Sequence, residues 1–278
     1  MGPSATSGDP DRRPAIDAAA ERLIDAAARR TPCAPVRDLL PDGGLDDGYA
    51  VQRAVRARTE SGRRRVGRKI GLTSAAVQQQ MGVTTPDLGV LHADMAYGDS
   101  EPIPADRLLQ PRIEAEVAFV LGTDLPDRPV TTADVLRAVD FVVAAIEVCD
   151  SRIARWDISL FDTVADNASS GVYVTSGAPR SLRDIDDLRA SEMYVTWGDE
   201  IVSSGTGAAC MGHPVNAVVW LANAVAEQGE PLVAGEIILS GSLGPLVPAR
   251  PGATYEATIG HLGSVRAVFD GGEAGDAG

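Results

Sequence analysis

The chain has 278 residues, of which 44% are hydrophobic and 4% aromatic, so its core must be packed mainly with Val, Ile, Leu and Ala. A formal net charge of −14 argues against a nucleic-acid-binding protein, because such proteins carry a basic face. The three cysteines form no CxxC pair, which argues against zinc and redox motifs and indicates a reducing, cytoplasmic compartment.

The N-terminal region is predicted to be helical. Residues 1–14 and 271–278 are rich in Gly, Ser, Asp or Ala and are expected to be disordered tails. A helix is predicted over residues 16–29, and a second follows the chain break at Pro41. Together they predict a small α-rich N-terminal lobe, residues 15–65. The N-terminus has no signal-peptide pattern and no apolar run reaches the ~18 residues of a membrane span, so we expect no membrane segment.

Residues 66–270 have the pattern of a catalytic core made mostly of strands. Helices are predicted near residues 132–139 and in HPVNAVVWLANAVAEQG, and a short one is predicted to run through Gln80 after a cap at Thr73 or Ser74. A hairpin is predicted to turn at Gly198-Asp199. The strands outnumber the helices and do not alternate strictly with them, which disfavours a Rossmann or TIM-barrel arrangement. We therefore predict an α+β fold with a mixed, mostly β core. The expected strands are VGRKIGL, RIEAEVAFVLG, FVVAAIEVCD, GEIILSGS, ATYEATI and GSVRAVF.

Three carboxylates stand in otherwise apolar strand patterns. Glu114 and Glu116 are two residues apart, so on a strand they point to the same face, and Glu147 lies in VVAAIEVCD. Clustered carboxylates in an apolar setting are costly unless a cation compensates them, and Mg²⁺ or Mn²⁺ prefers such oxygen ligands. The alternatives are a half-exposed strand with a solvated polar face, and a Glu147 paired with a buried Arg or Lys.

Further polar residues have both functional and ordinary interpretations. Lys69 lies in a strand pattern between Gly67 and Gly71, where a desolvated lysine would have a lowered pKa; alternatively, its side chain reaches water. The ordinary interpretation of Asp87 in TTPDLG is a turn residue that follows a proline. The run DTVADNASSG, which contains Ser169, is either a capping and turn cluster or a polar wall for a small acidic ligand.

Ordered motifs along residues 45–269 resemble the 2-keto-4-pentenoate hydratase branch of the fumarylacetoacetate hydrolase superfamily. They are GRKIGLTSAAVQQQMGVTTPDLGVLHADM, PRIEAEVAFVL, AAIEVCDSRI, DTVADNASSGVYV, GHPVNAVVWLAN and LSGSLGPLVP. The resemblance implies the family's mostly β core with a small α-rich N-terminal region. It also implies one Mg²⁺ or Mn²⁺ held at the positions that match the family's metal ligands, Glu114, Glu116 and Glu147.

The resemblance also implies an activity. Lys69 matches the family's active-site lysine, and Asp87 and Ser169 match positions implicated in proton transfer and substrate binding. The implied reaction adds water to 2-hydroxypenta-2,4-dienoate to give 4-hydroxy-2-oxopentanoate, in aromatic meta-cleavage catabolism. Which of Lys69 and Asp87 acts as acid and which as base stays open.

Alternative functions remain within the same branch. A 2-oxo-3-hexenedioate decarboxylase would need a second cationic anchor, for which Arg152 and Arg155 are candidates. A non-catalytic partner subunit is a further alternative. The resemblance also implies a homo-oligomer. A complex with an aldolase or decarboxylase of the same pathway is compatible with it.

Overall fold

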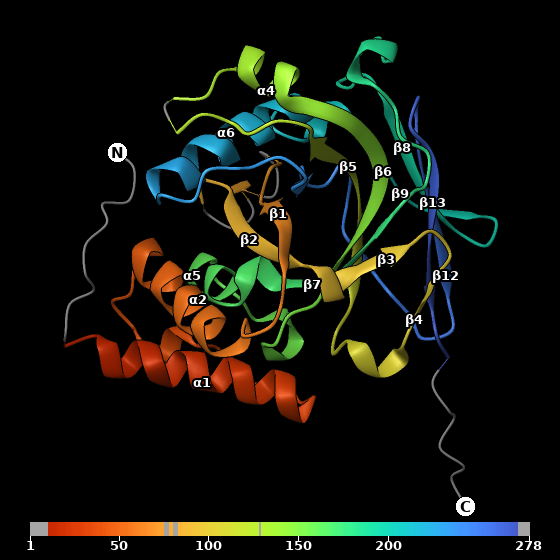
Figure 1. Cartoon of the computed structure of the whole chain (residues 1–278). Helices are drawn as coiled ribbons and strands as arrows, with labels where there is room; N and C mark the ends of the chain where they lie inside the picture. The colour runs from red at the N-terminus through yellow and green to blue at the C-terminus, as the bar shows by residue number, and fades with distance from the viewer. Residues whose placement is uncertain (1–10, 75–77, 80–82, 128, 272–278) are drawn as a thin grey trace, which may run out of the picture.

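The chain folds into two β-sheets with helices packed against them (Figure 1). The structure is a computed structural model that describes residues 11–74, 78–79, 83–127 and 129–271. Its α-helices are α1 (Arg13–Arg29), α2 (Leu45–Thr59), α4 (Thr132–Ala138), α5 (Leu160–Ala165) and α6 (Pro214–Glu227). Its strands are β1 (Arg65–Gly71), β2 (Asp87–His92), β3 (Ala96–Gly98), β4 (Pro102–Ile103), β5 (Arg112–Leu121), β6 (Val139–Cys149), β7 (Ser170–Thr175), β8 (Glu192–Trp197), β9 (Glu200–Thr206), β10 (Ile237–Leu239), β11 (Val247–Pro248), β12 (Thr254–Ile259) and β13 (Gly263–Phe269).

The predicted α+β fold with a mixed, mostly β core is confirmed. Over the described ranges, one sheet has the order β2-β1-β10-β5-β6-β7-β3 with β11 paired to β5, and the other has the order β4-β13-β12-β8-β9. Most pairs are antiparallel, while β1–β10, β3–β7 and β4–β13 are parallel. The predicted hairpin at Gly198-Asp199 joins β8 to β9, and the predicted C-terminal helix is α6.

The first helix begins earlier than predicted. Helix α1 starts at Arg13, so Arg13 and Pro14 belong to the helix and not to the expected tail. Proline is accommodated there because the first turn of a helix needs no backbone N–H from that residue. The expected tails otherwise fall largely on residues 1–10 and 272–278, which lie outside the described residues.

Helices α1 and α2 do not bury their apolar faces alone. Leu23 of α1 and Val51 of α2 belong to one buried cluster with Ile153 and Phe161, which come from the later part of the chain. In Figure 1 these two helices and α5 group on one side of the larger sheet. The division into a lobe of residues 15–65 and a core of residues 66–270 stays a prediction. None of the described helices is long and apolar enough to span a membrane.

Strands β5 and β6 are buried on both faces, and the two faces differ. One face carries Val117 and Ala144 into the main apolar core. The other face carries Ala118 and Val143 into a smaller cluster with Leu239. Because side chains alternate along a strand, Glu114, Glu116, Glu147 and Cys149 belong to this second face. Lys69 pairs with Leu239 across β1 and β10 and so shares the same face. The fold therefore brings the predicted site residues to one side of the larger sheet.

Candidate active site

The three carboxylates lie together on β5 and β6. Glu114 stands directly opposite Glu147 in the antiparallel pair, and Glu116 is the next residue along β5 on that face. Glu116 and Glu147 are 0% and 1% exposed, whereas Glu114 is half-buried. The alternative of a solvated polar face is therefore wrong for Glu116. The half-buried Glu114 marks the side from which an ion could enter.

The carboxylate oxygens are incompletely satisfied. Glu116 Oε2 accepts a hydrogen bond from the Gly241 N–H at 2.7 Å, but Glu116 Oε1 and Glu147 Oε2 have no hydrogen-bond partner among the described residues. Burial and then the charge of Glu147 raise the pKa of Glu114 to about 7, and the same two causes raise that of Glu116 well above its ordinary value. Orphaned buried oxygens on clustered carboxylates fit a hard divalent cation, which takes oxygen ligands and compensates their charge.

Cys149 adds a thiol to this cluster. One ligand atom from each of Glu114, Glu147 and Cys149 lies within 4.8 Å of the other two, and Cys149 Sγ is 3.8 Å from Glu114 Oε2. Burial and then Glu147 raise the pKa of the Cys149 thiol well above its ordinary value, so the thiol is neutral. A neutral thiol is a poor ligand for Mg²⁺. Glu116 is not a member of this closest trio, and its role as a metal ligand stays a prediction.

Lys69 is buried at the centre of the site. Its ammonium donates a hydrogen bond to the Ala168 carbonyl at 2.8 Å and lies 3.1 Å from Glu147 Oε1. Burial acts to lower the pKa of Lys69, but the neighbouring acidic groups, Glu147 first, outweigh burial and raise it well above its ordinary value. The expectation of a lowered pKa is therefore wrong, and so is the alternative of a side chain that reaches water, since Lys69 is 3% exposed. Lys69 is also the only lysine in the sequence.

Asp87 and Lys69 both approach Gly71. A Cβ atom at Gly71 would lie 2.1 Å from Asp87 Oδ1 and 3.3 Å from Lys69 Nζ, so only glycine leaves room for both groups. Asp87 opens strand β2 and is 2% exposed, so the interpretation as an ordinary turn residue is wrong. Burial raises the pKa of Asp87, against the lowering effect of the Lys69 charge. A raised pKa suits a group that exchanges a proton near neutral pH.

Thr163 connects Asp87 to Ser169. Its Oγ1 donates to Asp87 Oδ2 at 3.2 Å and lies 3.3 Å from Ser169 Oγ. The sequence interpretation named the polar neighbours of Thr163 but missed Thr163 itself. Cys149 was not among its candidate site residues either. The spacing of two residues from Glu147 to Cys149, the argument already applied to Glu114 and Glu116, was the available signal.

The predicted polar run around Ser169 divides into structural and site residues. Asp162 caps α5 through Ser159 and accepts from Arg37, so its role is structural. Arg152 forms an ion pair with Asp166 and donates to the Ser170 carbonyl at 2.7 Å. Only the following turn faces Lys69, through the Ala168 carbonyl.

The turn Asn167–Ser169 is strained. Asn167, Ala168 and Ser169 have φ values of 55°, 52° and 50°, which place three successive non-glycine residues in the left-handed region. Each such residue costs about 1–2 kcal/mol and persists only where its surroundings fix it. Here the Asn167 side chain does so, because it accepts from the Val90 N–H at 2.8 Å and donates to the Val90 carbonyl at 3.0 Å.

This strain predicts an unusual response to glycine. The substitution Ala168→Gly is expected to leave the free energy of unfolding unchanged or raise it by about 1 kcal/mol, because glycine adopts positive φ without a steric penalty. The matched change Ala165→Gly, at a buried position in the last turn of α5, is expected to lower it by about 1 kcal/mol. Urea unfolding of the two variants checks this, and an equal loss in both would contradict it.

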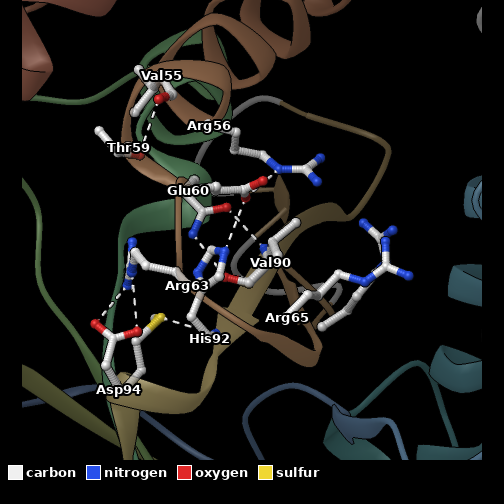
Figure 2. Close-up of polar contacts among 12 residues, drawn as sticks. Val55, Arg56, Thr59, Glu60, Arg63, Arg65, Val90, His92 and Asp94 are labelled. Atoms are coloured by element: carbon white, nitrogen blue, oxygen red, sulfur yellow. Dashed lines mark hydrogen bonds and ion pairs between the residues drawn. The ribbon is translucent and has the colours of Figure 1, made fainter.

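The arginines from the end of α2 to β1 form ion pairs with nearby acidic side chains. Figure 2 shows Glu60 between Arg56 and His92, with its Oε1 2.7 Å from Arg56 Nε and 3.0 Å from His92 Nε2. Arg63 donates to both oxygens of Asp94, at 3.0 and 2.9 Å. A cavity of about 470 Å³ adjoins this network, and His92 is one of its lining residues. On β1 itself, Arg65 pairs with Glu236 and Glu230, and Arg68 pairs with Glu230.

Comparison with known proteins identifies the family. The model of the fumarylacetoacetate (FAA) hydrolase C-terminal family matches residues 55–270. The chain belongs to the fumarylacetoacetate hydrolase family. Within this family, the chain is 53% identical to the 2-keto-4-pentenoate hydratase of Paraburkholderia xenovorans (strain LB400), over 91% of this chain and 94% of that protein. It is 42% identical to the 2-hydroxyhexa-2,4-dienoate hydratase of Comamonas testosteroni, over 91% and 97% of the two chains.

A solved structure of the fumarylacetoacetate hydrolase family is also similar. The 4-oxalocrotonate decarboxylase from Pseudomonas putida G7, complexed with magnesium and adipate, superposes with a TM-score of 0.87. The two sequences are 37% identical, and the match covers 92% of this chain and 98% of the decarboxylase. The chain is therefore similar to proteins with two different activities, hydratases and a decarboxylase.

Proposed function

We propose that this protein is a metal-dependent hydratase. It adds water to 2-hydroxypenta-2,4-dienoate, also called 2-keto-4-pentenoate, to give 4-hydroxy-2-oxopentanoate in the meta-cleavage catabolism of aromatic compounds. One observation carries the proposal: a charged lysine and a buried aspartate both approach Gly71, beside the three clustered carboxylates. The 53% identity to a 2-keto-4-pentenoate hydratase supports the same activity.

The metal would be held by Glu114, Glu116 and Glu147. These side chains supply oxygen ligands to Mg²⁺ or Mn²⁺, both of which accept carboxylates together with water. When bound, the cation supplies Lewis acidity and orients the substrate through its C1 carboxylate and C2 oxygen. The decarboxylase relative was solved in complex with magnesium, which supports a divalent metal ion.

The polar side chains around the carboxylate cluster carry out proton transfer and substrate binding. The reaction protonates C5 as the C2 hydroxyl loses its proton, which gives an α,β-unsaturated ketone whose C4 then accepts water. Lys69 holds its proton firmly and so acts as a donor toward the oxygen that develops charge at C2. Asp87, with its raised pKa, is the group that exchanges a proton. The Ser169 hydroxyl, positioned through Thr163, binds a substrate oxygen.

One predicted anchor of the decarboxylase alternative is already engaged. A substrate with a second carboxylate calls for a free cation at the far end of the site. The Arg152 guanidinium instead pairs with the Asp166 carboxylate and donates to the carbonyls of Asp166 and Ser170. This engagement of Arg152 favours the hydratase, and Arg155, whose side chain is exposed, stays the remaining candidate anchor.

A turnover assay tests the proposal. The ultraviolet absorbance of freshly generated 2-hydroxypenta-2,4-dienoate is expected to fall in the presence of Mg²⁺ or Mn²⁺, with a product one water heavier by mass spectrometry. The protein is expected to release no CO₂ from 2-oxo-3-hexenedioate. Release of CO₂ without hydration would support the decarboxylase instead. Folded, metal-loaded protein that acts on neither substrate would support a non-catalytic partner subunit.

The proposed oligomeric state, compartment and partners of this enzyme follow from the same resemblance. We propose a homo-oligomer that works in the cytoplasm, alone or with an aldolase or decarboxylase of the pathway. The three cysteines, Cys33, Cys149 and Cys210, are free, which fits a reducing compartment.

A further inference from the structure

Cys149 is placed to act as a fourth donor to the carboxylate cluster. Glu147 and Cys149 are two residues apart on β6, and Glu114 faces Glu147 across the β5–β6 pair. The three side chains therefore project from neighbouring positions on one face of the sheet. Their ligand atoms lie within 4.8 Å of one another, with Cys149 Sγ 3.8 Å from Glu114 Oε2.

The surroundings of these atoms point to a ligand. Glu147 is 1% exposed, and its Oε2 has no hydrogen-bond partner within the described part of the chain. Cys149 is 6% exposed, while Glu114 is half-buried and leaves access from solvent. Bond lengths of ~2.3 Å to sulfur and ~2.0 Å to oxygen place these two donors ~3.5 Å apart on a tetrahedral zinc ion. Cys149 Sγ and Glu114 Oε2, at 3.8 Å, are already near that separation, and the other pairs, within 4.8 Å, need to contract by roughly 1 Å to close around an ion.

We propose that Glu114, Glu147 and Cys149 form a second, overlapping position for a thiophilic divalent cation such as Zn²⁺ or Cd²⁺. The inference rests on the proposed carboxylate centre and deepens it. Soft thiolate selects Zn²⁺ and Cd²⁺, whereas Mg²⁺ and Mn²⁺ take the all-oxygen position of Glu114, Glu116 and Glu147. As the metal–sulfur bond forms, the thiol proton passes to water. Because the two positions share Glu114 and Glu147, one ion excludes the other, and thiophilic metals inhibit the enzyme.

Cadmium titration of the full chain tests this without a turnover readout. Cd²⁺ bound to thiolate gives an ultraviolet charge-transfer band, and free Mn²⁺ is counted by electron paramagnetic resonance. We expect the wild-type protein to develop the band with one equivalent of Cd²⁺ and to release its bound Mn²⁺ in parallel. Cys149→Ser is expected to lose the band while it still binds Mn²⁺.

Three variants serve as controls. Cys33→Ser and Cys210→Ser remove the other thiols and are expected to keep the band, as is Glu116→Gln, which leaves the thiol position intact. An undiminished band in Cys149→Ser, or Mn²⁺ that stays bound at full Cd²⁺ occupancy, would overturn the inference. Protein that shows the band and releases Mn²⁺ but does not hydrate the dienoate would refute the proposed function alone. Active protein without the band would refute this inference alone.

Discussion

Replacing Lys69 by methionine is expected to lower dienoate turnover by about 10²- to 10⁴-fold, the usual contribution of one positioned proton-transfer group. Methionine fills similar space but removes the only ammonium side chain in the protein. The change also leaves Glu147 without its charge partner at 3.1 Å, which in metal-free protein costs about 3–5 kcal/mol of stability. Turnover in saturating Mg²⁺, and urea unfolding in chelator, measure the two effects.

A double variant separates the catalytic effect of Lys69 from its structural effect. Lys69→Met combined with Glu147→Gln removes both members of the buried ion pair, so stability in chelator is expected to recover most of the loss. Turnover is expected to be no higher than in Lys69→Met, because the second change also removes one of the proposed metal ligands. A double variant that stays as unstable as the single variant would show that Lys69 stabilises the fold through some contact other than Glu147. Wild-type turnover in Lys69→Met would exclude Lys69 from the chemistry.

The strands and their faces were predictable from the sequence because the period of two is local information. It assigned Glu114 and Glu116 to one face and placed Glu147 in a strand buried on both sides. The register between β5 and β6 is not local. Nothing in the sequence says that Glu114 faces Glu147, because a slip of one residue would turn either carboxylate to the other side.

The parts of the site that escaped prediction depend on tertiary structure. Thr163 reaches Asp87 only because α5 packs beside β2 and the chain then turns through three left-handed residues. Non-glycine residues with positive φ have no reliable sequence signal. The pKa of Lys69 was predicted with the wrong sign, since burial alone lowers it and only the assembled structure supplies the opposing charge of Glu147.

Glu116→Gln is expected to remove most of the stabilisation of the protein by Mg²⁺ or Mn²⁺. An ion at 100 times its dissociation constant stabilises the native state by about 2.7 kcal/mol, and a hundredfold loss of affinity at the same concentration leaves about 0.4 kcal/mol. Hydration of the dienoate is expected to fall by at least about 10²-fold, since the cation orients the substrate. Thermal or urea unfolding with and without Mg²⁺ or Mn²⁺, together with turnover, checks both.

The same variant is expected to be as stable as the wild type in chelator, within about 1 kcal/mol. Burial and the charges of Glu147 and Glu114 raise the pKa of Glu116, so without metal its side chain carries a proton and glutamine is its isostere. Glutamine can still accept the Gly241 N–H bond that Glu116 Oε2 accepts. Glu200→Gln, at an exposed position on β9, is the matched control and is expected to keep the full stabilisation by metal. Metal stabilisation that survives in Glu116→Gln would remove Glu116 from the ligand set and leave the cation to Glu114, Glu147 and their remaining neighbours.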